Sequence, residues 1–178
     1  EGSRIKKIGK LNKKDSEQAR VIEARDQIVS PGFVQTHIHL CQTLFRNLAD
    51  DLELLDWLKL KIWPLEAAHT PQTIALSARI GLAELIQCGT TTIMDVATVH
   101  HTDQIFEEIE KSGMRALCGK AMMDDCPGAP KGLEEDAKWS IEESLRLKKY
   151  WHNRSDGRIQ FAFAPRFVLS CSESLLCA

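Results

Sequence analysis

The sequence predicts an α/β fold in which parallel β-strands alternate with covering α-helices. Short runs rich in apolar and β-branched residues alternate with longer segments of helical periodicity, four times over residues 33–178. The runs are nearly continuous in apolar residues, which is typical of parallel strands buried between helices. With 43% hydrophobic residues, the 178-residue chain is also long enough to bury a core.

The first strand is expected over residues 32–39, in the run GFVQTHIH, and we interpret it as buried. The segment after it has helical periodicity, which we expect to break at Pro64 because proline lacks a backbone N–H. A second helix is expected to have Thr70 as its N-cap and Pro71 at its first position. Gly89 marks its end.

The alternation continues through the rest of the chain. Further strands are expected over residues 90–97, 115–123 and 158–167, and further helices over 102–113 and 134–151. Ser170 and Glu173 have the spacing of a capping box, which predicts one more helix. Four β/α units suit either an open doubly wound sheet or half of a (β/α)8 barrel. No glycine-rich phosphate fingerprint follows the first strand, which argues against a dinucleotide-binding fold.

Residues 1–30 do not follow this pattern. Two short stretches, residues 4–9 and 19–24, are interpreted as strands joined by a polar turn. The predicted organisation is therefore part of a small β-sandwich domain over residues 1–30, followed by the first four β/α units of a truncated barrel over residues 31–178.

Composition narrows the class of partner. A net charge of −2 and dispersed basic residues give no reason to expect nucleic acid. No apolar run approaches the ~20 residues that span a membrane, and no signal-peptide pattern opens the chain. Six scattered cysteines include no Cys-x-x-Cys pair, so we expect a cytoplasmic protein without disulfides.

His37 and His39 are the clearest candidates for a metal-binding site. Alternate residues of a strand point to one face, so both imidazoles should project together. At the C-terminal end of a barrel strand they would lie at the mouth where barrel active sites form. Imidazole pairs suit Zn²⁺ or Fe²⁺, although a His-x-His pair also occurs for purely structural reasons. His69 and His152 are interpreted as surface histidines, and Asp95 as either structural or catalytic.

The run over residues 28–39 resembles the signature with which chains of the amidohydrolase superfamily pass from a β-domain into the first barrel strand. Glu66, the GTTT run at residues 89–92 and the APRF run at residues 164–167 also have counterparts in its aminohydrolase branch. The resemblance covers essentially the whole chain. It implies the first half of a (β/α)8 TIM-type barrel.

Two groups within this branch are similar to the chain. Gln42 and the pair Arg166 and Phe167 match base-binding positions of guanine deaminases, where a guanidinium suits a purine carbonyl and a phenyl ring stacks on the base. Trp57 and Glu66 lie in a segment similar to the first long loop of methylthioadenosine/S-adenosylhomocysteine deaminases, 5′-deoxyadenosine deaminases and s-triazine hydrolases. In the nucleoside deaminases the position of Glu66 binds ribose hydroxyls, but the position of Arg166 is a histidine.

The resemblance implies hydrolytic deamination of a small heterocyclic amine, guanine being favoured. Hydroxide on one divalent metal, Zn²⁺ or else Fe²⁺, would attack the ring carbon and release ammonia. A nucleoside of the 5′-deoxyadenosine, methylthioadenosine or S-adenosylhomocysteine type is the alternative substrate, as is a chlorotriazine.

The family's other ligands and its proton shuttle follow strand four, so we expect no catalytic residue within this chain and no turnover by these 178 residues alone. A homo-oligomer is expected, because a cut barrel leaves unpaired edges. The alternative of another class is an inactive barrel fragment that serves as an oligomeric or metal-binding scaffold.

Overall fold

The computed structural model describes residues 4–10, 17 and 19–178, and the chain divides into two compact units, Glu1–Pro31 and Gly32–Ala178. In the first unit, the described residues 4–10 and 19–31 contain no strand, so the strands predicted at residues 4–9 and 19–24 are not formed. Ile5 and Ile8 are 80% and 89% exposed, and Val21 is 71% exposed. A two-stranded ribbon with no buried face is marginal in water, which explains the difference.

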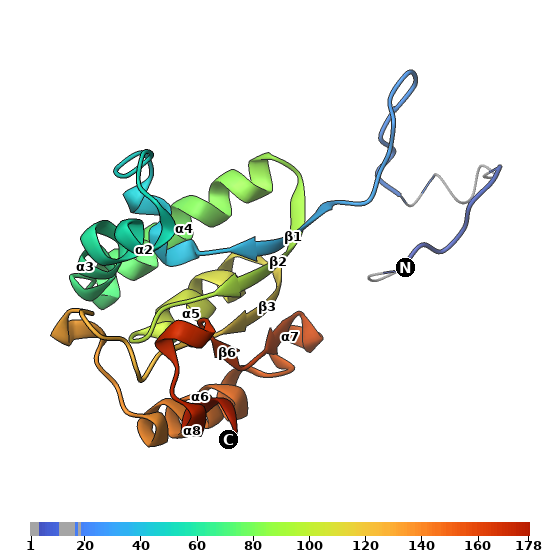
Figure 1. Ribbon diagram of the computed structural model, residues 1–178. Coiled ribbons are helices and arrows are strands. Elements are labelled where there is room, and N and C mark those ends of the chain that lie inside the picture. Colours follow the sequence, from blue (N-terminus) through green and yellow to red (C-terminus); the bar gives the residue numbers. More distant parts are fainter. Residues whose placement is uncertain (1–3, 11–16, 18) are drawn as a thin grey trace. The chain divides into compact units, whose positions relative to one another are not determined.

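The second unit contains a four-stranded parallel sheet of order β1-β2-β3-β5 (Figure 1). Its strands are β1 (Phe33–Ile38), β2 (Thr90–Val96), β3 (Arg115–Gly119) and β5 (Ile159–Phe161). A shorter parallel pair continues the last two: β4 (Ala121–Met122) and β6 (Ala164–Pro165). The predicted strands at 115–123 and 158–167 are therefore each interrupted, the first of them at Lys120. All pairings between these strands are parallel, as the apolar runs predict.

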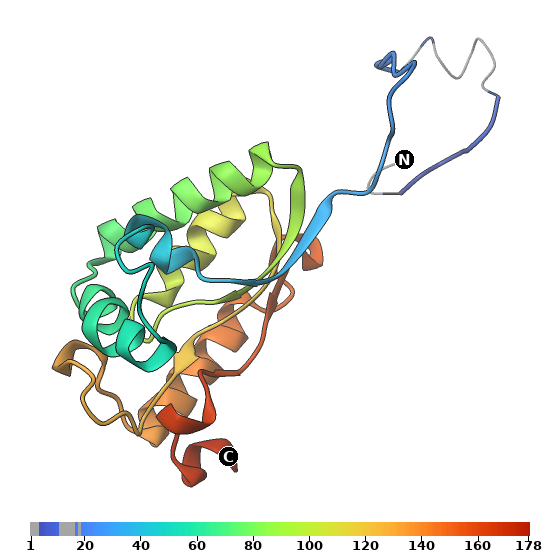
Figure 2. The same ribbon diagram turned by 45° about the horizontal axis from the view of Figure 1, so that its top comes forward.

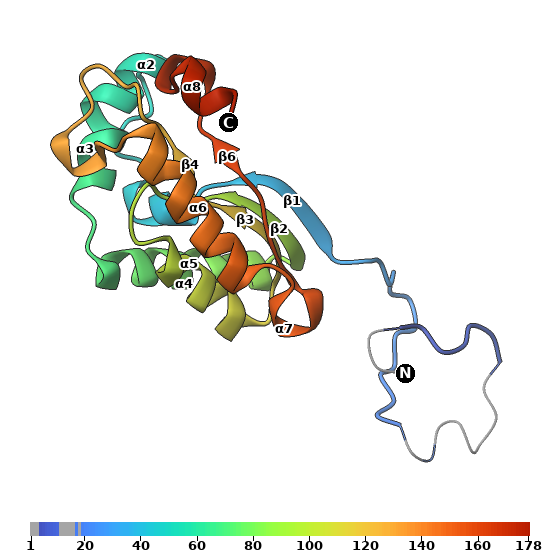
Figure 3. The same ribbon diagram turned by 90° about the horizontal axis from the view of Figure 1, so that it is seen from below.

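Three long helices pack on the sheet: α4 (Pro71–Gln87), α5 (Thr102–Ser112) and α6 (Ala137–Trp151). Figure 3 shows them covering one side of it. Together they bury one apolar core, to which α4 contributes Ile74, α5 contributes Phe106 and α6 contributes Trp151. The rings of Phe106 and Trp151 stack with centroids 5.2 Å apart. This core holds the strands in register and so positions their carboxyl ends.

Shorter helices fill the connections: η1 (Leu40–Phe45), α2 (Leu54–Trp57), η2 (Leu58–Ile62), α3 (Trp63–Ala67), η3 (Lys131–Leu133), α7 (Arg154–Gly157), η4 (Val168–Ser170) and α8 (Glu173–Leu176). Directly after β1, η1 packs against α4 (Figure 2). Among the described residues, no helix combines the length and apolar character of a membrane span. All six cysteines, each within the described part of the chain, are free, as expected.

The predicted helix boundaries hold for α4 and shift elsewhere. Thr70 caps α4 in a reciprocal pair with Thr73, and Gly89 follows the helix with φ +81°. The last helix is capped by Ser172, whose hydroxyl accepts from the Leu175 N–H, whereas Ser170 lies in η4. The capping-box spacing identified the right segment and the wrong serine.

Two further predictions are wrong. Strand β1 is exposed rather than buried, with Phe33 at 63% and Val34 at 60%, because it lies at the edge of the described sheet. The helical segment also does not break at Pro64. Just before Pro64, η2 is a π-helix, in which the Trp63 N–H donates to the Leu58 carbonyl five residues back. Helix α3 then begins at Trp63, and Pro64 lies in its first turn, where its missing N–H costs little.

Candidate active site

His37 and His39 project together from the carboxyl end of β1. Their Nε2 atoms lie 3.2 Å apart and their ring centroids 5.0 Å apart. The Nδ1 atom of His39 lies 2.8 Å from the Val96 carbonyl oxygen, which only accepts hydrogen bonds, so Nδ1 carries the proton. The lone pair on Nε2 of His39 therefore faces His37. Burial lowers the pKa of His39, which favours the neutral ring.

This geometry fits two ligands of one metal ion. Two nitrogens bound at the usual Zn–N length in a tetrahedral site lie about 3.3 Å apart, close to the observed separation. The hydrogen bond from His39 Nδ1 to a carbonyl is the usual outer contact of a metal-bound histidine. Within the described residues, however, no group of three or more His, Cys, Asp or Glu side chains is arranged to hold a metal. The pair would supply part of a ligand set.

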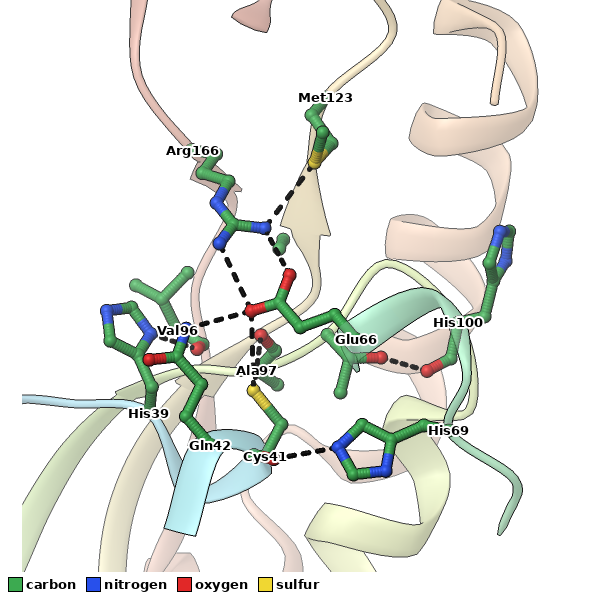
Figure 4. A network of polar contacts seen from close by, with 12 residues as sticks. His39, Cys41, Gln42, Glu66, His69, Val96, Ala97, His100, Met123 and Arg166 are labelled. Carbon is green, nitrogen blue, oxygen red and sulfur yellow. Dashed lines mark hydrogen bonds and ion pairs between the residues drawn. The ribbon is translucent and has the colours of Figure 1, made fainter. Parts of the chain in front are cut away.

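Gln42, Glu66 and Arg166 meet in a buried polar network (Figure 4). They come from η1, from α3 and from the residue after β6. Arg166 binds the Glu66 carboxylate through two contacts, Nη1 to Oε2 at 2.6 Å and Nη2 to Oε1 at 3.1 Å. Gln42 Nε2 donates to Glu66 Oε1 at 2.8 Å. The side chains of Glu66 and Arg166 are only 2% and 9% exposed, so solvent screens this ion pair little.

The network leaves hydrogen-bonding groups free for a ligand. An ionised carboxylate only accepts, so the NH2 of Gln42 faces Glu66 and its Oε1 has no partner among the described residues. Arg166 uses Nη1 and Nη2 on Glu66, and Nη1 also lies 3.5 Å from Met123 Sδ. Its Nε–H and one Nη2–H have no described partner. Arg166 and Glu66 also act electrostatically on His39, which places the network beside the histidine pair.

The two aromatic residues that were predicted to contact the substrate, Trp57 and Phe167, lie outside this polar network. Trp57 and Phe167 pack on a second apolar cluster built around Trp63 and Met123. A cavity of about 390 Å³ is lined by His39, Gln42 and Trp57 together with residues of η1 and α4, but not by Glu66, Arg166 or Phe167. Of the five predicted substrate-binding residues, the structure thus brings three into direct contact, and it links Trp57 to Gln42 through the cavity.

Two contacts outside the network position the segment after β1. For Asp95 this is the structural role that the sequence left open beside a catalytic one, and for His69 the contact was not predicted. Asp95 is buried on β2, and its Oδ1 accepts from the Leu40 N–H at 2.8 Å, immediately after His39. Burial raises the pKa of Asp95 to about 7. His69 is no simple surface residue, because its Nε2 lies 2.8 Å from the Cys41 carbonyl oxygen. No sequence spacing signals either contact.

A third feature, a fully buried ion pair, joins Lys120 to Glu135 beneath the Trp139 ring. Lys120 Nζ also donates to the Ala121 carbonyl and to Ser140 Oγ, so all three of its donors are used. The sequence held one signal for it, a lysine inside the otherwise apolar run that follows Arg115. Lys120 lies at the break between β3 and β4, and Glu135 also accepts from the Met123 N–H just after β4 at 2.8 Å.

Comparison with known proteins agrees with this architecture. A family model described as the amidohydrolase family matches residues 28–178. The chain belongs to this family, which confirms the resemblance seen in the sequence.

Relatives within the family carry more specific names. A 5-methylthioadenosine/S-adenosylhomocysteine deaminase of Syntrophomonas wolfei is 34% identical over 97% of this chain and 38% of its own length. A 5′-deoxyadenosine deaminase of Methanocaldococcus jannaschii is 34% identical over 99% of this chain and 40% of its own length. The guanine deaminase of C. acetobutylicum, solved with guanine in its active site, aligns with a TM-score of 0.77 and 30% identity over 82% of this chain and 35% of that one. The chain thus spans about two fifths of these curated relatives, and its fold is a partial barrel.

Proposed function

We propose that this chain forms part of the active site of a metal-dependent hydrolytic deaminase that acts on an N-heterocycle, with guanine favoured. Membership of the amidohydrolase family and the deaminase names of the relatives support the reaction class. His37 and His39 would hold one divalent ion, for which Zn²⁺ is proposed first, although imidazole ligands accept Fe²⁺ as well. When bound, such an ion supplies an activated water at neutral pH.

The observation that carries the choice of guanine is the pair of free groups on Arg166 and Gln42. The Nε–H and Nη2–H of Arg166 can donate to a ring carbonyl, and the Oε1 of Gln42 can accept from a ring N–H or amino group. Guanine presents both kinds of group on one edge. Glu66 holds the two side chains at this spacing, and both lie beside the His39 ring.

The chain's own residues therefore bind and orient in this proposal. The Val96 carbonyl keeps the proton on Nδ1 of His39, which leaves Nε2 free for the ion. Arg166 and Gln42 fix the heterocycle in its plane, and Trp57 offers an apolar wall at the adjoining cavity. Phe167 follows Arg166 directly and is proposed to stack on the ring.

A nucleoside of the 5′-deoxyadenosine or S-adenosylhomocysteine type is the second candidate. Two curated relatives with these names support it, each aligned over almost all of this chain. It assigns Glu66 to the ribose hydroxyls. Glu66 Oε1 already accepts from Arg166 and Gln42, whereas Oε2 accepts only from Arg166 and keeps one acceptor site that a ribose hydroxyl could use.

The test is ammonia release by the protein expressed from its complete reading frame, with guanine, 5′-deoxyadenosine and S-adenosylhomocysteine as substrates. Guanine is expected to give the highest kcat/KM. Arg166→Ala should lower that value at least about a hundredfold at unchanged metal content, because a charged hydrogen bond to the base is lost. Arg79→Ala removes an arginine that binds Glu108 in the same two-contact manner away from the site, and serves as the matched control. Preference for a nucleoside would refute the choice of guanine.

A further inference from the structure

One histidine outside the network holds the turn from which Gln42 extends. His69 lies between α3 and α4, and its Nε2 is 2.8 Å from the Cys41 carbonyl oxygen. Its ring stacks on Phe45, with centroids 5.0 Å apart and planes 26° from parallel. Figure 4 shows the contact of His69 with Cys41, and the stacking on Phe45 lies on the other side of Gln42 in η1. His69 therefore contacts this turn both before and after Gln42.

The hydrogen bonds of His69 fix its ring orientation. A carbonyl only accepts, so Nε2 carries the proton that bonds to Cys41. Burial lowers the pKa of His69 and favours the neutral ring, which leaves Nδ1 as an acceptor. The Thr73 hydroxyl lies 2.9 Å from Nδ1 and 3.1 Å from the Thr70 carbonyl oxygen, so its one proton can serve either acceptor. Because Thr73 belongs to the capping pair that starts α4, the ring is anchored to a rigid helix end.

The same residue is tied to the element that carries Glu66. The backbone N–H of His69 donates to the Glu66 carbonyl at 3.2 Å. One residue therefore contacts both η1 and α3, whose side chains Gln42 and Glu66 meet at 2.8 Å. We propose that His69 is a positioning residue, which holds η1 against α3 so that the free amide oxygen of Gln42 faces the substrate heterocycle. This inference rests on the proposed function.

Two substitutions separate the hydrogen bond from the stacking. His69→Phe keeps a ring against Phe45 but removes the N–H donor, whereas His69→Gln keeps a donor at a similar reach and removes the ring. In the protein from the complete reading frame, His69→Phe should raise KM about tenfold, the value of one lost hydrogen bond, with kcat within about twofold. His69→Gln should restore KM to within about threefold of wild type. Equal KM for wild type and His69→Phe would overturn the proposal, as would a fall in kcat alone.

Hydrogen exchange of the backbone amides of residues 40–48 gives a readout that does not need activity. His69→Phe should speed exchange there at least about fivefold, and His69→Gln should leave it near wild type. Unchanged exchange in His69→Phe would refute the positioning role. If exchange responds but wild type deaminates no heterocycle, the proposed function fails and the positioning role stands. Should His69→Phe not fold, Thr73→Val removes the hydroxyl facing Nδ1 together with its capping bond to the Thr70 N–H, and it is expected to raise KM about threefold. Thr70→Val removes the other capping hydroxyl, leaves the one facing Nδ1 in place and serves as the control. An unchanged KM in Thr73→Val would then overturn the proposal.

Discussion

Arg166 and Glu66 lie 100 positions apart in the sequence, yet their side chains form a two-contact ion pair that is almost completely buried. The pair joins the segment after β6 to helix α3, two elements that otherwise meet through apolar contacts around Met123. The ion pair also determines where Gln42 can bond, because Arg166 and Gln42 both donate hydrogen bonds to Oε1 of Glu66. The relative positions of Gln42 and Arg166 thus depend on this ion pair.

Arg166→Met should destabilise the protein by about 3 kcal/mol, because it leaves the Glu66 carboxylate buried without its counter-charge. The double variant Glu66→Gln with Arg166→Met should recover part of this loss, since no unpaired charge remains. Urea unfolding of the four proteins of this double-mutant cycle measures the coupling. Arg46→Met, which breaks a solvent-exposed pair with Glu84, is the control and should change stability little. Strictly additive losses would contradict this account.

Removal of either histidine of the pair should reduce bound metal. His37→Ala and His39→Ala each delete one nitrogen of the expected ligand set, so the purified full-length variants should hold much less than one equivalent of metal. Elemental analysis of dialysed protein gives the metal content directly, and a chelator should abolish wild-type activity. His152→Ala, at an exposed histidine, is the control. Full metal occupancy in both variants would remove His37 and His39 from the site.

Stability should fall with rising pH because of Asp95. Its pKa is raised from the ordinary value near 4 to about 7 in the folded protein, since burial disfavours the charged form. Between these two values the folded protein binds more protons than the unfolded chain. The contribution of Asp95 to the free energy of unfolding is therefore fully present below about pH 4 and is lost as the pH rises through 7. The total loss is about 4 kcal/mol.

Asp95→Asn keeps an oxygen acceptor for the Leu40 N–H but does not titrate. Its free energy of unfolding should change less between pH 5 and pH 7.5 than that of wild type, as measured by urea unfolding. Asp56→Asn, at an exposed carboxylate, should retain the wild-type dependence. An identical pH dependence in wild type and Asp95→Asn would show that Asp95 does not titrate in this range.

Two glycines should respond differently to alanine. At Gly119 a Cβ atom would lie 2.1 Å from the Ala162 carbonyl oxygen, so Gly119→Ala must push the chain after β5 away from β3. We expect a loss of about 3 kcal/mol or more. At Gly113 nothing lies within 4 Å, and only the φ of +76° is unfavourable, so Gly113→Ala should cost about 1 kcal/mol. Thermal unfolding of both variants checks the order, and a larger loss at Gly113 would contradict it.

Much of the barrel portion follows from local patterns. The apolar runs, the Thr70 cap and Gly89 determine β2, α4 and their parallel neighbours, because the responsible interactions are short in sequence. Exposure of β1 does not follow, because an apolar run looks the same at the edge of a sheet as at its centre. Within the described residues 4–10 and 19–31 the two expected strands are absent, because short apolar runs such as these form strands only where they bury a face.

The site was predictable to a similar extent. Strand periodicity alone brings His37 and His39 to one face. Family resemblance selected Gln42, Glu66 and Arg166, but their mutual contacts span 24 and 100 residues and depend on tertiary packing. Asp95 and His69 act through backbone groups of other segments, and such bonds leave no trace in residue spacing.

The π-helical turn η2 has a consequence for the direction of Glu66. A π-turn holds one residue more than an α-helical turn, so it rotates everything after it by about 100° around the helix axis. Helix α3, which carries Glu66, follows this turn directly. Deletion of one residue within Leu58–Ile62 would restore an ordinary helical phase and turn the carboxylate away from Arg166. The extra residue of this π-turn therefore determines the direction in which the Glu66 side chain points. A change in the number of residues here would alter the geometry of the network without replacing any residue that forms it.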